Sequence, residues 1–272
     1  MTNNSYKLLI MDVDGTLVGK DGTISAEDRE ALTRARASGV RISLSTGRVP
    51  QACSRIIDQL DMDTCHIFFD GALVSNPDRA EEVYVQPLSE MLVRQAVEFA
   101  RRYDLYLELY STAHYFVERE TWASDIHRQF FGIHPAVVDF TGIWGKERII
   151  KGELLTSSPQ EAARARRLYR QLNGGLRFSW AKSPAYPGID FINVVDPQVS
   201  KGKALEVLVR HLGVSLSEVI AIGDGINDIS LLTKAGLAIA MHNAPAEVKA
   251  VADYVTLDVE NSGLAAAIDR FL

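Results

Sequence analysis

The sequence predicts an α/β protein in which a doubly wound parallel sheet forms the core and an α+β module is inserted into it. Apolar, strand-like runs alternate with helix-like stretches near both ends of the 272-residue chain. Such alternation with short links is typical of a parallel sheet that helices cover on both faces. Between about Tyr84 and Tyr186 the pattern becomes mixed, which indicates a separate module.

The N-terminal part of the core is expected to contain three strands and two helices. The strands are predicted at Lys7–Met11, Val40–Leu44 and His66–Phe69, and the helices at Ser25–Ser38 and Pro50–Leu60. Ser25 suits the N-cap position because its hydroxyl can accept a hydrogen bond from a free backbone amide. Asp28, three residues later, fits a loose form of the capping box. Asp70-Gly71 is predicted to form a turn after the third strand.

The C-terminal part of the core continues the same alternation. Its helices and strands are predicted, in chain order, at Lys203–Leu212, Val219–Ile222, Ile229–Ala235, Leu237–Ala240 and Ala246–Ala252. Each predicted strand is short and strongly apolar, as expected for strands buried on both faces of a parallel sheet.

The inserted module is predicted to combine helices with antiparallel strands. Its elements are expected at Glu90–Tyr103, Leu105–Tyr110, His114–Val117, Pro159–Leu172 and Leu176–Trp180. The second and third of these segments are expected to form a hairpin. Linkers near Gln86 and Pro187 would then divide the chain. Residues 1–85 and 188–272 form the predicted core, and residues 86–187 form the predicted inserted domain.

Composition excludes several classes of protein. The chain is 47% hydrophobic and 24% charged with a net charge of -6, which gives no sign of the basic surface that nucleic-acid binding requires. No apolar stretch approaches the roughly 18 residues of a membrane span, and the first ten residues lack a signal-peptide pattern. Cys53 and Cys65 are too few for a disulfide framework. We therefore expect a cytoplasmic protein without nucleic-acid or membrane partners.

Two carboxylates stand out directly behind the first predicted strand. Asp12 and Asp14 lie two positions apart, so they would share a face if the strand continued. Carboxylates held close together resist ionising unless a cation or a shared proton lies between them. The pair therefore indicates either a bound metal or a shared proton.

Three further polar clusters follow a predicted strand or precede a predicted helix. They are Ser45-Thr46-Gly47-Arg48, Ser200-Lys201-Gly202-Lys203 and Gly223-Asp224-Gly225-Ile226-Asn227-Asp228. In an open parallel sheet, ligands bind in the crevice beyond the carboxyl ends of the strands, so these distant segments are expected to meet there. Aspartates, a hydroxyl, a lysine and glycine backbone amides suit phosphoryl transfer, because Mg²⁺ prefers hard oxygen ligands and aspartate is a known nucleophile towards phosphorus.

With all four motifs in order, the chain resembles the haloacid dehalogenase-like (HAD) hydrolase superfamily, in particular its Cof-type sugar-phosphatase branch. The motifs are Asp12-Val-Asp14-Gly-Thr-Leu, Ser45-Thr46-Gly-Arg48, Val199-Ser-Lys201-Gly and Gly223-Asp224-Gly-Ile-Asn227-Asp228, and the insert has the place and size of that branch's large cap. The resemblance implies a Rossmann-like core, an α+β cap that selects the substrate, and Mg²⁺-dependent hydrolysis of a small phosphate monoester through an aspartyl-phosphate.

The resemblance also implies roles for individual residues. Asp12 would be the nucleophile, and Asp14 would protonate the leaving oxygen and later activate water. Thr46 and Lys201 would orient and neutralise the phosphoryl group. Asp12, the backbone carbonyl of Asp14 and Asp224 would bind Mg²⁺, with Asp228 in support. Asp14 separates phosphate chemistry from dehalogenation, because the dehalogenases of this superfamily lack an acid there.

Five other residues are candidates for contact with the phosphate or the substrate, and three of them keep two interpretations. Gly15 and Gly47 would offer backbone amides to phosphate. Arg48 either contacts substrate or ties down its own loop, and Asn227 either orients Lys201 or Asp224 or caps the next helix. Asn243 either reaches phosphate or serves as a turn residue. None of the histidines shows metal-ligand spacing, so they are interpreted as structural or surface residues.

The chain departs from the Cof-type pattern at two positions. It has Asp70 before Gly71 where that branch usually carries Asn, and Asn193 where relatives often carry Glu.

Two alternative functions also stay open. The same site would serve a phosphotransferase or phosphomutase, and a non-catalytic sensor of a phosphorylated metabolite is the alternative outside enzymes. Sugar phosphates, phosphoglycolate, pyridoxal phosphate and flavin mononucleotide all fit as small-molecule partners.

Overall fold

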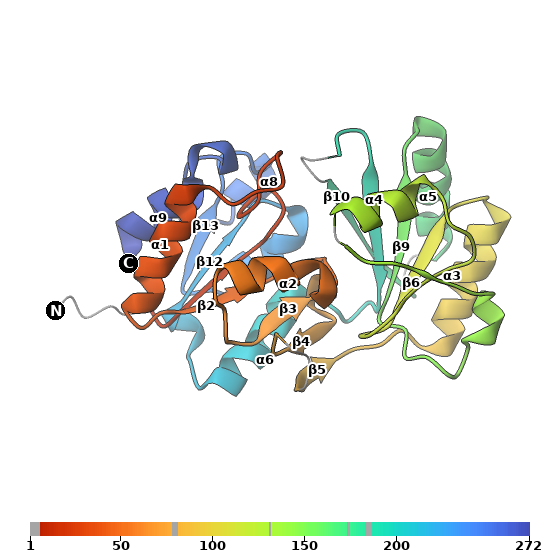
Figure 1. Ribbon diagram of the computed structural model, residues 1–272, viewed down its shortest axis with the longest axis horizontal. Helices are drawn as coiled ribbons and strands as arrows, with labels where there is room; N and C mark the ends of the chain where they lie inside the picture. The colour runs from red at the N-terminus through yellow and green to blue at the C-terminus, as the bar shows by residue number, and fades with distance from the viewer. Residues whose placement is uncertain (1–5, 78–80, 131, 173–174, 183–185) are drawn as a thin grey trace. The chain divides into compact units, whose positions relative to one another are not determined.

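The computed structural model describes residues 6–77, 81–130, 132–172, 175–182 and 186–272. The chain divides into two compact units (Figure 1). The first unit contains residues 1–47, 55–84 and 200–272, and the second contains residues 48–54 and 85–199. Within the described residues, no helix is long and apolar enough to cross a membrane.

A five-stranded parallel sheet forms the centre of the first unit. Its strand order is β14-β13-β12-β1-β2, and each described neighbouring pair is parallel. The strands span, in this order, Tyr254–Val255, Leu237–Ala240, Val219–Gly223, Leu8–Met11 and Arg41–Leu44. The predicted α/β core is therefore confirmed. β1, β12 and β13 are buried along their whole length, as expected for central strands of a parallel sheet, whereas β2 begins at the exposed Arg41.

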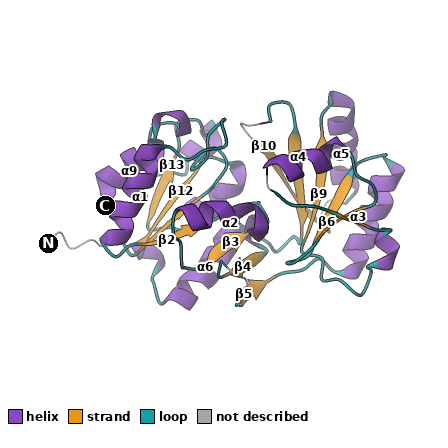
Figure 2. Ribbon diagram, viewed as in Figure 1, coloured by secondary structure: helices purple, strands orange, loops and turns teal. Residues whose placement is uncertain are grey.

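Helices cover both faces of this sheet (Figures 1 and 2). The helices are α1 (Ala26–Ala37), α6 (Lys201–Leu212), α7 (Ile229–Leu232), α8 (Ala246–Lys249) and α9 (Gly263–Phe271). Leu8 and Ile10 pack in one cluster with Leu205 of α6. Side chains alternate along a strand, so Leu9 and Met11 point to the opposite face, where α1 and α9 pack together.

The capping prediction for α1 is confirmed at Ser25, whose hydroxyl accepts a hydrogen bond from the Asp28 backbone amide at 3.0 Å. The carboxylate of Asp28 has a further partner, since it accepts a hydrogen bond from the backbone amide of Ala265 at 2.7 Å. Asp28 is buried and lies at the first turn of α9, where a negative charge is favourable. The N-termini of two helices are thus joined through one aspartate.

The third predicted strand has a different place from the one expected. β3 (His66–Phe68) pairs antiparallel with β4 (Leu73–Ser75) in a separate sheet that also contains β5 (Glu82–Val85). A single bridge between Ser45 and Ile67 joins β3 to the end of β2. The chain reverses after Asp70-Gly71, so β4 returns beside β3. Helix α2 (Pro50–Gln59) precedes this hairpin.

The second unit is an α+β layer built on a six-stranded sheet. The strand order is β10-β11-β9-β6-β7-β8, and the strands span, in this order, Arg177–Lys182, Asp190–Val195, Lys151–Thr156, Leu107–Tyr110, Tyr115–Val117 and Ala136–Val137. The predicted hairpin of β6 and β7 is confirmed, because the two strands pair antiparallel. Helices α3 (Glu90–Arg102), α4 (Trp122–Phe130) and α5 (Pro159–Gln171) complete the unit.

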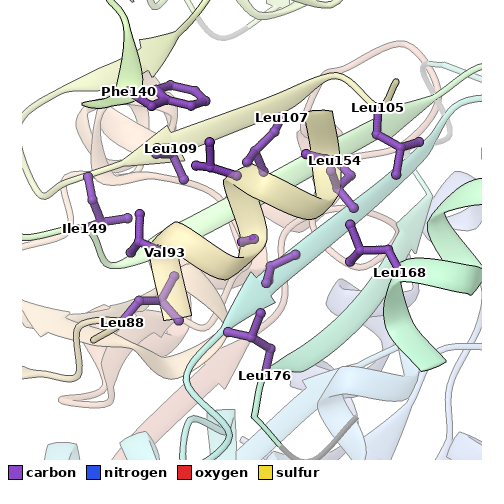
Figure 3. Close-up of a cluster of buried hydrophobic side chains, with 14 of the residues drawn as sticks. Leu88, Val93, Leu105, Leu107, Leu109, Phe140, Ile149, Leu154, Leu168 and Leu176 are labelled. Carbon is purple, nitrogen blue, oxygen red and sulfur yellow. The ribbon is translucent and has the colours of Figure 1, made fainter. Parts of the chain in front are cut away.

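This unit has a hydrophobic core of its own. Figure 3 shows side chains of α3, α5 and the sheet meeting in one cluster, among them Val93, Leu109 and Leu168. The second boundary of the unit differs from the expected one near Pro187. β11 pairs with both β9 and β10, so the chain leaves this unit only after Val199.

Candidate functional site

The first unit brings Asp12 and Asp224 to the ends of two adjacent strands. β1 and β12 run parallel with Met11 opposite Ile222. The backbone amide of Asp12 continues this ladder by donating to the carbonyl of Ile222 at 3.0 Å. Because the ladder is in register, the two carboxylates emerge at the same edge of the sheet.

Lys201 joins two of the carboxylates. Its Nζ lies 2.6 Å from Asp12 Oδ1 and 2.5 Å from Asp228 Oδ1. The predicted helix start is wrong here, since α6 begins at Lys201 itself with Ser200 as its N-cap. A cation at the first position of a helix is unfavourable for the helix dipole, and the two carboxylates offset that cost. The ammonium is completely buried.

Asp224 is held from the side of the first motif. Its Oδ1 accepts a hydrogen bond from Thr16 Oγ1 at 2.8 Å, and its Oδ2 accepts one from Asn243 Nδ2 at 3.2 Å. Gly15 passes directly beside it with a φ of +88°. A Cβ at Gly15 would lie closer to Asp224 Oδ2 than real Cβ atoms approach any neighbour, so this position requires glycine.

Asp228 is the anchor of the fourth motif. Its Oδ2 accepts hydrogen bonds from the backbone amides of Asp224 and Gly225, at 3.1 and 2.8 Å. Its other oxygen accepts from Lys201, so both oxygens of this fully buried carboxylate have partners. Asp228 therefore fixes the loop that positions Asp224.

The electrostatic balance of the cluster is negative. Asp12, Asp224 and Asp228 lie around the single ammonium of Lys201, which leaves two negative charges without a matching cation in this cluster. Burial, assisted by Asp228, raises the pKa of Asp224 to about 7. Burial and the neighbouring carboxylates also raise the pKa of Asp12. Burial alone would lower the pKa of Lys201, but Asp12 and Asp228 outweigh it and raise that pKa.

This donor set fits a divalent cation. One carboxylate oxygen from each of Asp12, Asp224 and Asp228 lies within 4.8 Å of the other two. These are hard oxygen ligands of the kind that Mg²⁺ prefers. A charge of +2 would balance the cluster and offset the repulsion that, together with burial, raises the pKa values of Asp12 and Asp224. The side-chain oxygens of Asp14 are not part of this trio.

Of the remaining predicted residues, Thr46, Gly47 and Asn243 belong to the first unit and Arg48 belongs to the second. Thr46 is buried directly after β2, and its backbone amide donates to the carbonyl of Ile67 at 2.9 Å. Asn243 Nδ2 donates to the carbonyl of Gly15 at 2.9 Å as well as to Asp224, so Asn243 braces the first motif.

Asn227 has a partner that the sequence did not indicate. Its Nδ2 donates a hydrogen bond to Asp70 Oδ1 at 2.9 Å. The suggested roles for Asn227 were to orient Lys201 or Asp224 or to cap a helix. The structure joins it to the turn after β3. Asp70 is 5% exposed, so the departure from the Cof-type pattern lies inside the site.

A second cluster of metal-ligand types lies in the second unit and was missed. Glu108, His127 and Glu153 are buried and bring ligand atoms within 4.8 Å of one another. They come from β6, α4 and β9, so the sequence shows no ligand spacing. Their charges are matched internally. Tyr110 and Tyr115 donate to Glu108 at 2.5 and 2.6 Å. Lys151 pairs with Glu153 at 3.2 Å, and His127 pairs with Glu108 at 3.3 Å.

Comparison with known proteins agrees with this architecture. The family model of haloacid dehalogenase-like hydrolases matches residues 9–268, so the chain belongs to this family. The Cof-type resemblance and the expectation of a HAD-type phosphatase are confirmed at the level of the family.

Three relatives illustrate the similarity. The phosphatase YwtE of Bacillus subtilis, named for 5-amino-6-(5-phospho-D-ribitylamino)uracil, is 27% identical, with 98% of each chain covered. A haloacid dehalogenase-like hydrolase from Bacteroides thetaiotaomicron superimposes with a TM-score of 0.85 at 28% identity, covering 98% of this chain and 100% of that one. The subclass IIB sugar phosphatase BT4131 has a TM-score of 0.82 at 27% identity, covering 97% and 98%.

Proposed function

We propose that this protein is a Mg²⁺-dependent phosphatase that hydrolyses a small phosphate monoester through an aspartyl-phosphate on Asp12. The observation that supports this most directly is the trio Asp12, Asp224 and Asp228 around the buried ammonium of Lys201. This cluster has less positive than negative charge, and it lies at the sheet edge where α/β proteins bind their ligands. A divalent cation would complete its charge balance.

The residues of the site have distinct tasks in this reaction. Asp12 attacks phosphorus and carries the phosphoryl group. Asp14 donates a proton to the leaving oxygen and then takes one from the water that attacks the aspartyl-phosphate. Lys201 and Thr46 hold the phosphoryl oxygens and offset their charge. The backbone amide of Gly15 already donates to the carbonyl of Val18 at 3.0 Å, so Gly47 is the glycine proposed to offer its amide to the same group.

Asp12, Asp224 and the backbone carbonyl of Asp14 would hold Mg²⁺, with Asp228 in support. When bound, the ion supplies positive charge that stabilises the charge developing on the phosphoryl oxygens. Asp228 keeps this arrangement rigid, because its own oxygens are already bonded to Lys201 and to the backbone of the metal-binding loop.

In this proposal the second unit is the cap that selects the leaving group of the substrate. Arg48 groups with that unit. Substrates in the class of sugar phosphates and related metabolites fit this proposal, and BT4131 is a sugar phosphatase. A cytoplasmic location, in which Cys53 and Cys65 stay reduced, completes it.

The proposal is tested by phosphate release from a panel of metabolites. The panel contains sugar phosphates, phosphoglycolate, pyridoxal phosphate, flavin mononucleotide and 5-amino-6-(5-phospho-D-ribitylamino)uracil, each with and without Mg²⁺. We expect release by the wild type with Mg²⁺, loss on adding a chelator, and loss in Asp12→Asn, which keeps the size of the side chain. Tight binding without release of phosphate from any substrate would instead identify a sensor.

A phosphotransferase would use the same residues with a different acceptor. Product analysis in the presence of a free sugar separates the two reactions. Inorganic phosphate as the main product supports the hydrolase, and a newly phosphorylated sugar in place of phosphate supports the transferase.

A further inference from the structure

The turn that follows β3 carries a buried carboxylate inside the candidate site. Asp70 has a left-handed backbone conformation with φ of +56°. Its backbone amide donates to the carbonyl of Thr46 at 3.0 Å, and its Oδ1 accepts from Asn227 Nδ2 at 2.9 Å. Asp70 thus connects the loop of the second motif with the loop of the fourth.

The same turn also contacts the third motif. A Cβ at Gly71 would collide with the backbone carbonyl of Ser200 and would lie within 2.9 Å of the amide nitrogen of Lys201. This close approach places the turn against the start of α6. Residues 70 and 71 therefore lie where three of the four motif loops meet.

Asp70 adds negative charge beside Lys201. The ammonium is already bonded to Asp12 and Asp228, and Asp70 is a further carboxylate whose charge acts on it. The phosphate dianion expected at Lys201 would be repelled by such a group, and in a buried site this repulsion is weakly screened.

We propose that Asp70 is a positioning residue with two separable effects: it orients Asn227, and through it the loop of Asp228, and its charge limits the affinity of the site for phosphate. This inference rests on the proposed phosphatase function. The first effect depends on a hydrogen-bond acceptor at position 70, whereas the second depends on a negative charge there. Limited affinity for phosphate would favour release of the product.

Two variants separate these effects. Asp70→Asn keeps a carbonyl oxygen that accepts from Asn227 but removes the charge. Asp70→Ala removes both. With p-nitrophenyl phosphate and Mg²⁺, we expect Asp70→Asn to lower KM and the inhibition constant of inorganic phosphate by about tenfold. We expect Asp70→Ala to lower kcat by about tenfold, because the amide of Asn227 loses its partner.

A charge exchange tests the pair directly. Asn227→Asp places two carboxylates against each other, so kcat should fall. Asp70→Asn combined with Asn227→Asp restores a donor and an acceptor in reversed order at the original net charge, so kcat should recover at least about tenfold over Asn227→Asp alone. Asp63→Asn, at an exposed aspartate of the same unit, controls for the change in net charge. Circular dichroism checks the fold of every variant.

The outcomes discriminate between the two levels of inference. An active wild type with unchanged phosphate inhibition in Asp70→Asn, or with no recovery in the double variant, overturns the role of Asp70 and leaves the phosphatase intact. A wild type that releases no phosphate from any substrate overturns both. If Asp70→Ala does not fold, Asp70→Asn and the double variant Asp70→Asn with Asn227→Asp still test the role of Asp70.

Discussion

At the scale of single residues, the site depends on contacts between groups that are far apart in the chain. Lys201 bonds to Asp12 and to Asp228, and Thr16 bonds to Asp224. These contacts hold three carboxylates in one place although like charges repel. Since buried charges are costly unless they are paired, this arrangement fits the proposed cation site better than a role in stability.

Asp14 should act in both halves of the reaction, and Asp14→Asn tests this. Nitrophenolate leaves readily without a proton, so the first half should survive with p-nitrophenyl phosphate. The second half needs a base and should slow by roughly 10²–10⁴-fold. Rapid-mixing measurements should then show a burst of nitrophenolate close to one per enzyme, followed by very slow turnover. A rate equal to that of the wild type would contradict the role of Asp14.

Gly15 should be irreplaceable because of Asp224, and a matched glycine provides the control. Gly15 and Gly39 have φ values of +88° and +90°, but only Gly15 faces a neighbour within 4 Å. Alanine in this conformation costs about 1–2 kcal/mol at either position. We expect both variants to lower the melting temperature and only Gly15→Ala to lose Mg²⁺-dependent activity. Equal activity in the two variants would show that the contact with Asp224 does not matter.

At the scale of secondary-structure elements, a buried ionic network joins α4 to the sheet of the second unit. His127 of α4 faces Glu108 of β6, Tyr115 of β7, and Lys151 and Glu153 of β9. Burial opposes the charge on His127, but Glu108 outweighs this effect and raises the pKa of His127. The network thus holds α4 on the hairpin of β6 and β7 and on β9.

This network predicts a pH-dependent stability of the second unit. Since the pKa of His127 is raised on folding, its contribution is fully present below the unfolded value of about 6.5 and is lost as pH rises through the folded value. His127→Gln should lower the free energy of unfolding by about 3–5 kcal/mol at pH 6, because it leaves Glu108 buried without its cation. The difference from the wild type should shrink towards alkaline pH.

Tryptophan fluorescence measures this effect selectively. The three tryptophans, Trp122, Trp144 and Trp180, all lie in the second unit. Urea unfolding followed by fluorescence at several pH values therefore reports on that unit. The pH dependence of stability expected from His66 of the first unit has the opposite sign. Burial lowers the pKa of His66 to about 3, so its contribution to stability is lost as pH falls below about 6.5. The same pH dependence in His127→Gln and in the wild type would disprove the ion pair.

At the scale of the whole molecule, the two units differ in how the chain builds them. The second unit consists almost entirely of one continuous segment, residues 85–199, whereas the first is assembled from separate stretches. The second unit also has its own hydrophobic cluster (Figure 3). A continuous segment with its own core has what a domain needs to fold alone.

The segment 85–199 should therefore fold when it is produced by itself. We expect a cooperative urea transition in its tryptophan fluorescence and dispersed amide resonances in its NMR spectrum. A gradual, non-cooperative transition would show that the segment depends on the first unit. The segment contains neither Asp12 nor Asp224, so it should bind no Mg²⁺ at the concentrations that support catalysis.

The sequence alone determined the core elements, since they depend on local patterns. The apolar runs at β1, β12 and β13 are fully buried strands, β2 is buried apart from Arg41, and hydrophobic periodicity is visible without any knowledge of the fold. The carboxylate trio could also be anticipated, because chain segments that follow parallel strands converge at one edge of the sheet.

Only the tertiary structure decided which side chains are paired. The path of the chain places β3 beside β4. It also brings Lys201 to its two carboxylate partners and Asp70 to Asn227. The same holds for Glu108 and His127 in the second unit. Such pairs leave no periodic signal in the sequence, because each depends on how separate elements pack rather than on the residues near them in the chain.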